Sequence, residues 1–146
     1  MSVRTLLGGK VEVKTLGSMQ PADPRPETRA RILAPGGELA VLSEGSAPIR
    51  YLAYVELRAG TVRGNHFHKD RNERLYLLAG EAELFLQDME TGERGEVKLR
   101  PGDLASIPPN VAHAFLPGSN GHAVEFAAEA FEAADVYRIE ALHRQA

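Results

Sequence analysis

Short apolar segments recur along most of the chain, and clusters of glycine, proline, asparagine and aspartate separate them. In residues 81–87 charged and apolar residues alternate, which is typical of a strand with one buried face. Residues 74–78 form a nearly continuous apolar run closed by Gly80, which predicts a strand buried on both faces. Further strands are expected at residues 6–13, 29–33, 38–42, 50–57, 96–99, 104–107, 111–116, 122–127 and 136–139. Short strands at a spacing of about ten residues, with little helix, predict an antiparallel β-sandwich or β-barrel.

The N-terminal region is less regular. Three prolines within residues 17–27 exclude regular structure there and predict a loop or arm. We therefore expect residues 1–28 to form an arm with one peripheral strand, and the C-terminus to close with a frayed helical turn. This arm offers material for packing across a homodimer, and the alternative is a loop that lies on its own barrel. The length of 146 residues suits one domain, residues 1–146.

The amino-acid composition excludes several classes of binding partner and of chemistry. Hydrophobic residues make up 43% and charged residues 25% of the chain, as in an ordinary globular protein. The net charge is −3 and no basic run occurs, so neither nucleic acid nor an anionic membrane is expected as a partner. The absence of cysteine excludes disulfides, thiolate metal sites and thiol nucleophiles. We find neither a signal peptide nor a membrane-spanning segment, and the cytoplasm is the expected location.

Two histidines one residue apart, His66 and His68, are the most informative residues of the chain. On an extended strand they point to the same face, because side chains repeat every two residues. Glu73 follows after a short turn, and His113 arrives from a distant strand. Three imidazoles and one carboxylate form a suitable shell for Zn, Ni, Fe, Mn or Co. The alternative is that these are surface histidines on an edge strand, with Glu73 a solvated charge.

The spacing of these residues resembles the two motifs of the cupin superfamily. Gly60, His66, His68, Glu73 and Gly80 stand at the positions of the first motif, and a second set matches the other motif: Gly102, Pro108 and His113. The resemblance covers residues 51–127 and implies a small jelly-roll barrel, a double-stranded β-helix, in which His66, His68, Glu73 and His113 bind one divalent transition metal ion. Two positions depart from the pattern, Asn110 in place of glycine and Pro117 in place of asparagine.

A finer resemblance concerns residues 63–69 and the pair Asn72-Glu73. These residues are similar to the cupin portion of capsular-polysaccharide hexulose reductases and to sugar-modifying cupins of the rhamnose-epimerase-like group. The resemblance implies a keto-sugar or a related small polar metabolite as substrate. The first hypothesis is thus a metal-dependent isomerase or epimerase acting on a carbonyl-bearing sugar. A non-haem iron dioxygenase with the same ligands and a non-catalytic small-molecule-binding module are the alternatives.

The sequence does not identify the catalytic acid or base. Tyr54, Glu56, Arg63 and Tyr76 are candidates, but strand parity alone does not decide which of them point inward. Arg63 and Asn65 flank the first histidine and are suited to bind a phosphate or carboxylate. The alternative for both residues is a position on the outer surface of the strand. Residues 135–138 have no chemical role that the sequence indicates.

Overall fold

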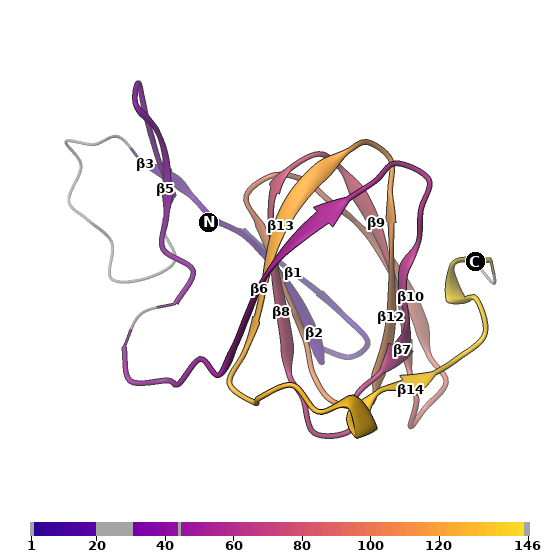
Figure 1. The fold of residues 1–146 in the computed structure, drawn as a ribbon. Helices are drawn as coiled ribbons and strands as arrows, with labels where there is room; N and C mark the ends of the chain where they lie inside the picture. Colours follow the sequence, from indigo (N-terminus) through magenta and orange to yellow (C-terminus); the bar gives the residue numbers. More distant parts are fainter. Residues whose placement is uncertain (1, 20–30, 44, 145–146) are drawn as a thin grey trace.

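Two antiparallel β-sheets packed face to face form the body of the molecule (Figure 1). The computed structural model describes residues 2–19, 31–43 and 45–144. The strands of the described parts are β1 (Ser2–Leu6), β2 (Val11–Thr15), β3 (Ser18–Met19), β4 (Arg31–Ala34), β5 (Gly37–Ala40), β6 (Tyr51–Leu57), β7 (Arg63–Phe67), β8 (Glu73–Ala79), β9 (Ala82–Asp88), β10 (Arg94–Leu99), β11 (Asp103–Ile107), β12 (Val111–Pro117), β13 (Gly121–Ala127) and β14 (Tyr137–Arg138). Two short 3-10 helices, η1 (Ala133–Asp135) and η2 (Leu142–Arg144), lie near the C-terminus. The predicted all-β jelly roll with little helix is confirmed.

The order of the strands places two edges on the same side of the barrel. One sheet has six strands in the order β1-β2-β11-β8-β13-β6, and the other has five in the order β10-β9-β12-β7-β14. Strand β6 therefore ends the first sheet and β14 ends the second. A smaller sheet of β3, β4 and β5 lies on the outer side of the six-stranded sheet (Figure 1).

The core fills the space between the two large sheets. Inward-facing residues of both sheets form one buried cluster: Leu7, Val11, Val13, Val55, Leu57, Leu75, Leu77, Leu84, Leu86, Leu99, Ala105, Ile107, Val111, Phe115 and Ala123. Burial on this scale is the main favourable contribution to folding. In β8, Leu75 and Leu77 face this core, while Tyr76 is buried on the outer face in a second cluster with Leu104 and Phe126. Leu78 is 43% exposed, so the prediction of burial on both faces holds for only part of β8.

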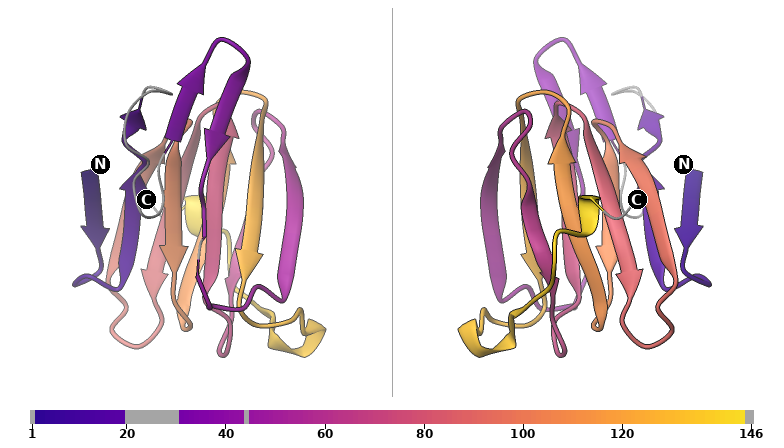
Figure 2. Two further views of the ribbon diagram at one scale, coloured as in Figure 1. Left: turned by 90° about the vertical axis from the view of Figure 1, so that its left-hand side faces the viewer. Right: turned by 90° about the vertical axis from the view of Figure 1, so that its right-hand side faces the viewer.

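The N-terminal segment differs from the single strand expected at residues 6–13. Strand β1 ends at Leu6 and β2 begins at Val11, because Leu7, Gly8 and Gly9 adopt positive φ angles of 53°, 66° and 90° and turn the chain. Strand β2 pairs with β11, so the hairpin forms one edge of the six-stranded sheet (Figure 2). The predicted proline-rich loop falls mostly on residues 20–30, which lie outside the described residues.

The C-terminal segment returns along the five-stranded sheet. Strand β14 pairs with β7, and η2 packs on the outer face of β9 and β12 (Figure 2). Leu142 is buried there against Phe85, Ala112 and Ala114. No helix in the described parts of the chain has the length and apolar character needed to cross a membrane.

Candidate metal centre

Four residues far apart in the sequence meet between the two sheets. His66 lies on β7, His68 directly follows that strand, Glu73 begins β8 and His113 lies on β12. One ring nitrogen from each of the three histidines lies within 4.8 Å of the other two. Glu73 Oε2 is 2.9 Å from Nε2 of His113, and Glu73 Oε1 is 3.8 Å from Nε2 of His68. His68, Glu73 and His113 are buried, and His66 is half-buried. The structure thus brings together all four predicted ligands.

A bulge in β7 aims two side chains at this centre. His113 pairs with His66, but its neighbour Ala114 pairs with Gly64, so Asn65 is the extra residue of the ladder. Asn65 has φ of 60° and Gly64 has φ of 106°. Without the extra residue, Arg63 and His66 would point to opposite faces of the sheet. With it, both line the interior of the barrel.

Position 64 requires glycine for two reasons: the backbone of β12 lies very close, and the φ angle is positive. A Cβ atom there would lie 2.7 Å from the carbonyl oxygen of His113 and 3.2 Å from the Cα atom of Ala114. Asn110, which departs from the cupin pattern, has φ of 64° and occupies the left-handed region as its type allows.

Hydrogen bonds to the backbone orient two of the imidazoles. Nδ1 of His68 lies 2.7 Å from the carbonyl oxygen of Asp135, and Nδ1 of His113 lies 3.1 Å from that of Val111. A carbonyl only accepts hydrogen bonds, so Nδ1 donates in both rings and Nε2 is the nitrogen that faces the centre. Nε2 of His68, Nε2 of His113 and Nδ1 of His66 are buried without an aligned hydrogen bond.

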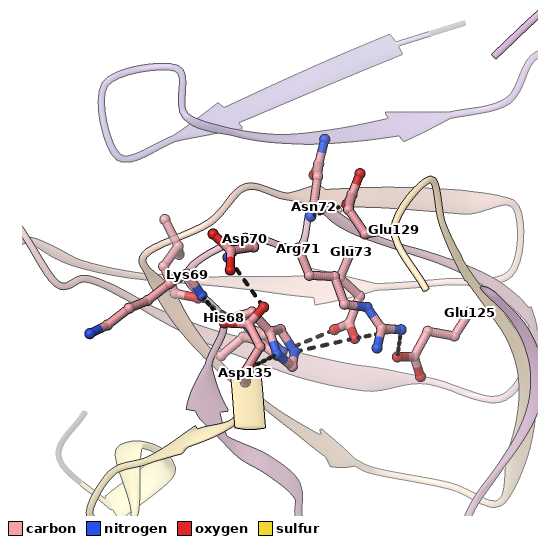
Figure 3. Close-up of polar contacts among 11 residues, drawn as sticks. His68, Lys69, Asp70, Arg71, Asn72, Glu73, Glu125, Glu129 and Asp135 are labelled. Carbon is pink, nitrogen blue, oxygen red and sulfur yellow. Dashed lines mark hydrogen bonds and ion pairs between the residues drawn. The ribbon is translucent and has the colours of Figure 1, made fainter. Parts of the chain in front are cut away.

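The turn between β7 and β8 is held by the C-terminal segment (Figure 3). The carboxylate of Asp135 accepts hydrogen bonds from the backbone amides of Lys69 at 2.7 Å and Asp70 at 3.2 Å. Glu129 accepts one from the amide of Asn72 at 2.8 Å. This turn carries His68 at its start and Glu73 at its end, so Glu129 and Asp135 fix the separation of two candidate ligands.

Burial and mutual proximity set the protonation of the four groups. Burial, together with the nearby His113 and His68, lowers the pKa of His66 to about 4. The pKa of His68 is also lowered, chiefly by burial. Burial raises the pKa of Glu73 and lowers that of His113, but their mutual attraction prevails, so Glu73 has a lowered and His113 a raised pKa. These shifts favour a buried ion pair between Glu73 and His113, whereas they favour the neutral forms of His66 and His68.

Glu125 on β13 is a site residue that the sequence reasoning missed. Its pKa is raised to about 9 by burial and by the hydrogen bond and negative charge of Glu73. Arg71 donates to Glu125 at 3.1 Å, lies 3.7 Å from Glu73 and stacks 3.9 Å above the ring of Tyr51. Glu125 lies opposite Leu75, whose side chain faces the interior, so Glu125 also faces inward. The sequence of β13 alone does not show this, because the register depends on how β13 pairs with β8.

A cavity of about 290 Å³ is lined by three of the four residues, His66, Glu73 and His113. Its lining has an apolar part and a charged part: Val55, Leu57, Val62, Leu75 and Phe115, together with Arg63, Gly64, His66, Glu73, His113, Glu125 and Arg138. A volume near the lower end of the range of about 300–1,000 Å³ for small-molecule sites suits a compact ligand. Polar groups that converge in an otherwise apolar pocket are typical of a binding or active site.

Of the four candidate acid–base residues, only Arg63 lines this cavity. Tyr54 is 64% exposed on the outer face of β6 and hydrogen-bonds to His122. Glu56 is exposed beside Arg58, and Tyr76 lies on the outer face of β8 with its hydroxyl donating to Glu38. The structure therefore does not bring these three residues to the site, because the strand register points them away from the interior.

Asn65, which the sequence suggested as an anion-binding residue, contacts the C-terminal segment instead. Its carbonyl oxygen accepts a hydrogen bond from the amide of Ile139 at 3.0 Å, and its side-chain oxygen accepts one from the amide of Leu142 at 2.9 Å. Asn65 thus anchors the C-terminal segment to β7.

The four side chains suit a divalent transition metal. Metal–nitrogen bonds of about 2.1 Å allow ligand nitrogens to be at most about 4.2 Å apart. The ring nitrogens, all within 4.8 Å of one another, need to approach by only a few tenths of an ångström. Buried nitrogens without aligned partners are the groups that such an ion satisfies.

A jelly-roll barrel with three histidines and a glutamate in its interior defines the class of cupin-type proteins. The model of the cupin domain family matches residues 53–127, and the chain belongs to this family. No curated protein sequence matches the chain significantly.

Solved structures share the fold at low sequence identity. The dTDP-6-deoxy-D-glucose-3,5-epimerase RmlC of Legionella pneumophila, in complex with dTDP-4-keto-L-rhamnose, is 13% identical with a TM-score of 0.76, over 99% of this chain and 80% of that one. The TDP-quinovose 3,4-ketoisomerase WlaRB of Campylobacter jejuni is 20% identical with a TM-score of 0.69, over 88% and 92% of the two chains. The capsular polysaccharide assembling protein CapF of Staphylococcus aureus is 20% identical with a TM-score of 0.57, over 66% of this chain and 30% of its own. The fold neighbours thus include sugar epimerases and ketoisomerases.

Proposed function

We propose that this cupin is a metal-dependent isomerase or epimerase acting on a carbonyl-bearing sugar or a related small polar metabolite. The observation that carries the proposal is a compact cavity whose wall combines the imidazoles of His66 and His113 and two carboxyls with apolar side chains, beside a cluster of three histidines. Reactions of this kind move a proton next to a carbonyl, which requires a group that polarises the carbonyl and a positioned acid–base group. The epimerases and ketoisomerases among the fold neighbours support the same class of reaction.

His66, His68, Glu73 and His113 would hold one divalent metal ion, with zinc, nickel, iron, manganese and cobalt as the candidates. When bound, such an ion acts as a Lewis acid toward a substrate oxygen. The backbone carbonyls of Asp135 and Val111 keep Nε2 of two imidazoles directed at the centre. The proton that His113 shares with Glu73 would leave on binding, because a ligating imidazole must be neutral.

We assign proton transfer to the carboxyl group of Glu125. It lines the cavity next to Glu73, and it is the acid–base group of the described lining residues that is not among the four ligands. Arg71 fixes its position by a hydrogen bond of 3.1 Å to Oε1. Apolar neighbours such as Leu75 and Phe115 limit the water that reaches the reacting atoms.

The test is turnover by protein loaded with each metal in turn. A panel of ketoses, aldoses and their phosphate and nucleotide esters in deuterated water, followed by NMR, would show proton exchange next to the carbonyl. We expect exchange in the loaded wild-type protein and a loss of at least about 100-fold in Glu125→Gln, because a positioned acid–base group typically contributes about 10²–10⁴-fold. Metal retention by this variant is the control. Tight sugar binding without exchange on the whole panel would favour a non-catalytic binding module.

An iron dioxygenase is the second candidate, because imidazole and carboxylate ligands also suit iron. The iron-loaded protein would then consume oxygen with a diol or diketone and show no proton exchange with sugars. This result would favour the dioxygenase over the isomerase.

We also propose that the protein is a homodimer. Ile49, Leu52 and Tyr54 are 45%, 70% and 64% exposed and lie on or beside β6, an edge strand with free backbone groups. A second copy that covers this edge would bury these side chains. Analytical ultracentrifugation is the measurement, and Leu52→Glu is expected to shift a dimer toward the monomer. A monomeric wild-type protein would contradict the proposal.

A further inference from the structure

We propose that Arg63 and Arg138 together bind an oxyanion of the ligand at the rim of the cavity, so that the substrate is a sugar phosphate or a sugar acid rather than a neutral sugar. The inference deepens the proposed function, since it takes the same cavity as the substrate site. It also gives a role to β14, which lies outside the cupin segment of residues 53–127.

Both arginines are directed at the cavity by the strand register. Arg63 pairs with Phe115 across β7 and β12, and Arg138 pairs with His66 across β14 and β7. Directly opposed residues of an antiparallel pair share a face of the sheet. Phe115 and His66 line the cavity, and both arginines line it with them.

Neither of these two arginines forms an ion pair with a carboxylate in the described parts of the chain. Arg71, the third arginine at the site, is held by Glu73 and Glu125. Among the residues that the structure describes, no ion pair or side-chain hydrogen bond involves Arg63 or Arg138. A phosphate or carboxylate offers several acceptor lone pairs and is bound well by two guanidinium groups. The cavity therefore presents two cationic donors near the imidazoles of His66 and His113.

The two arginines lie nearer the surface than the imidazole and carboxylate groups, and this difference sets the expected orientation of the ligand. Arg63 and Arg138 are exposed, whereas Glu73 and His113 are buried. Arg138 belongs to the edge strand β14, and Val55 and Leu57 in the opposite wall belong to the edge strand β6. The cavity thus reaches the side of the barrel where both sheets end. A single sugar ring suits the volume of about 290 Å³, with its charged group at the arginines and its carbonyl end toward the imidazoles.

Binding to chelator-treated protein tests the site without any need for turnover. Isothermal titration calorimetry at low ionic strength would use inorganic phosphate and acetate as simple anions, and fructose 6-phosphate against fructose and glucuronate against glucose as matched pairs. We expect the charged member of at least one pair to bind about tenfold or more tightly than its neutral partner, because charge-assisted hydrogen bonds are the stronger ones. The phosphate pair and the acid pair distinguish the two sources of the oxyanion.

Substitutions locate the site. Arg138→Met and Arg63→Met are each expected to remove most of the preference for the charged ligand, and Arg138→Lys to keep part of it. Arg100→Met is the matched control, since Arg100 is an exposed arginine of the turn before β11 and does not line the cavity. Melting curves of all variants check that the fold is kept. Chemical shifts in ¹⁵N-labelled protein should change at residues 63–66 and 137–139 when phosphate is added.

Equal affinity for charged and neutral ligands, saturation by none of the anions, or an unchanged preference in Arg138→Met would overturn the inference. Its failure is distinguishable from that of the proposed function. Anion binding that depends on the two arginines, with no proton exchange on any sugar, would keep the anion site and reject the isomerase. Exchange on neutral sugars alone would keep the isomerase and reject the anion site.

Discussion

The backbone carbonyl of Asp135 accepts a hydrogen bond of 2.7 Å from Nδ1 of His68, although 66 residues separate the two along the chain. The carboxylate of the same Asp135 accepts bonds from the amides of Lys69 and Asp70, the two residues that follow this histidine (Figure 3). One residue outside the cupin segment thus fixes both the ring of a candidate ligand and the turn that follows it. Outer partners of this kind tune the affinity of a metal site.

Asp135→Ala keeps the carbonyl that binds His68 but removes the carboxylate that holds the turn between two candidate ligands. It is therefore expected to weaken metal binding by about tenfold, the lower end of the range for the loss of a group that supports a ligand. Titration of the chelator-treated protein with zinc or nickel, followed by calorimetry, is the measurement. Glu132→Ala, an exposed acidic residue of the same segment, is the control and should bind the metal as the wild type does. Equal affinity in Asp135→Ala and the control would show that the turn holds its shape without the aspartate.

Removal of a ligand should have a larger effect than removal of its partner. Elemental analysis of protein purified without chelator is expected to find about one ion per chain in the wild type. His113→Ala and Glu73→Gln should each lower the metal affinity by more than about 100-fold, which is the upper limit for loss of a residue that only supports a ligand. His122→Ala, an exposed histidine on the outer face of β13, should retain the metal. Full occupancy in both ligand variants would contradict the assignment of the site.

Gly64→Ala tests the bulge in β7. A Cβ atom would stand 2.7 Å from the carbonyl oxygen of His113, and φ is 106° at this position. The expected cost is about 1–3 kcal/mol of unfolding free energy from the strained backbone, and more if β7 and β12 must separate. Gly118→Ala is the control, since nothing lies within 4 Å of its Cβ position. Urea unfolding gives both values, and equal stability of the two variants would argue against the bulge as observed.

The outer face of β8 supplies a pH-dependent contribution to stability. Burial raises the pKa of Glu38, but hydrogen bonds from Arg31 and Tyr76 outweigh it, so the pKa lies below its usual value of 4.5. The folded state then binds fewer protons than the unfolded state near that pH, and the stabilisation is present above pH 4.5 and lost as the pH falls through the folded pKa.

Glu38→Gln should consequently be less stable than the wild type at pH 7, by about 1 kcal/mol for charge-assisted bonds at a partly exposed site. The difference should disappear in acid, where the wild-type carboxylate is protonated. Thermal unfolding between pH 3 and pH 7 is the measurement, and Tyr76→Phe should show a smaller loss with the same dependence. A difference that stays constant over this range would show that Glu38 acts through packing alone.

Local patterns in the sequence predicted most of the strands. Alternation in residues 81–87 and turn clusters such as Pro101-Gly102-Asp103 predicted β9 and the start of β11 within a few residues. The failures lie where backbone conformation overrides propensity. The apolar pattern of residues 6–13 suggested one strand, but the positive φ angles of Leu7, Gly8 and Gly9 divide it into two.

The four candidate ligands were predictable because their spacing along the chain is itself informative. His66 and His68 are separated by one residue, and Glu73 follows one tight turn later, so local geometry brings them together. The catalytic candidates were not predictable in this way. Tyr54, Glu56 and Tyr76 face outward, and Glu125 faces inward, because the pairing of β6, β8 and β13 sets their faces.

The sequence by itself determined the all-β class, the cupin motifs and the four candidate ligands, because each depends on residue types at fixed local spacing. Only the tertiary structure decided which side chains of the outer strands reach the cavity, that Asn65 forms a bulge which turns Arg63 inward, and that Asp135 and Arg138 return to the site. Those relations depend on strand register and on contacts between distant segments. A shift of one residue in register moves a side chain to the other face of a sheet, and the sequence of a single strand does not encode that shift.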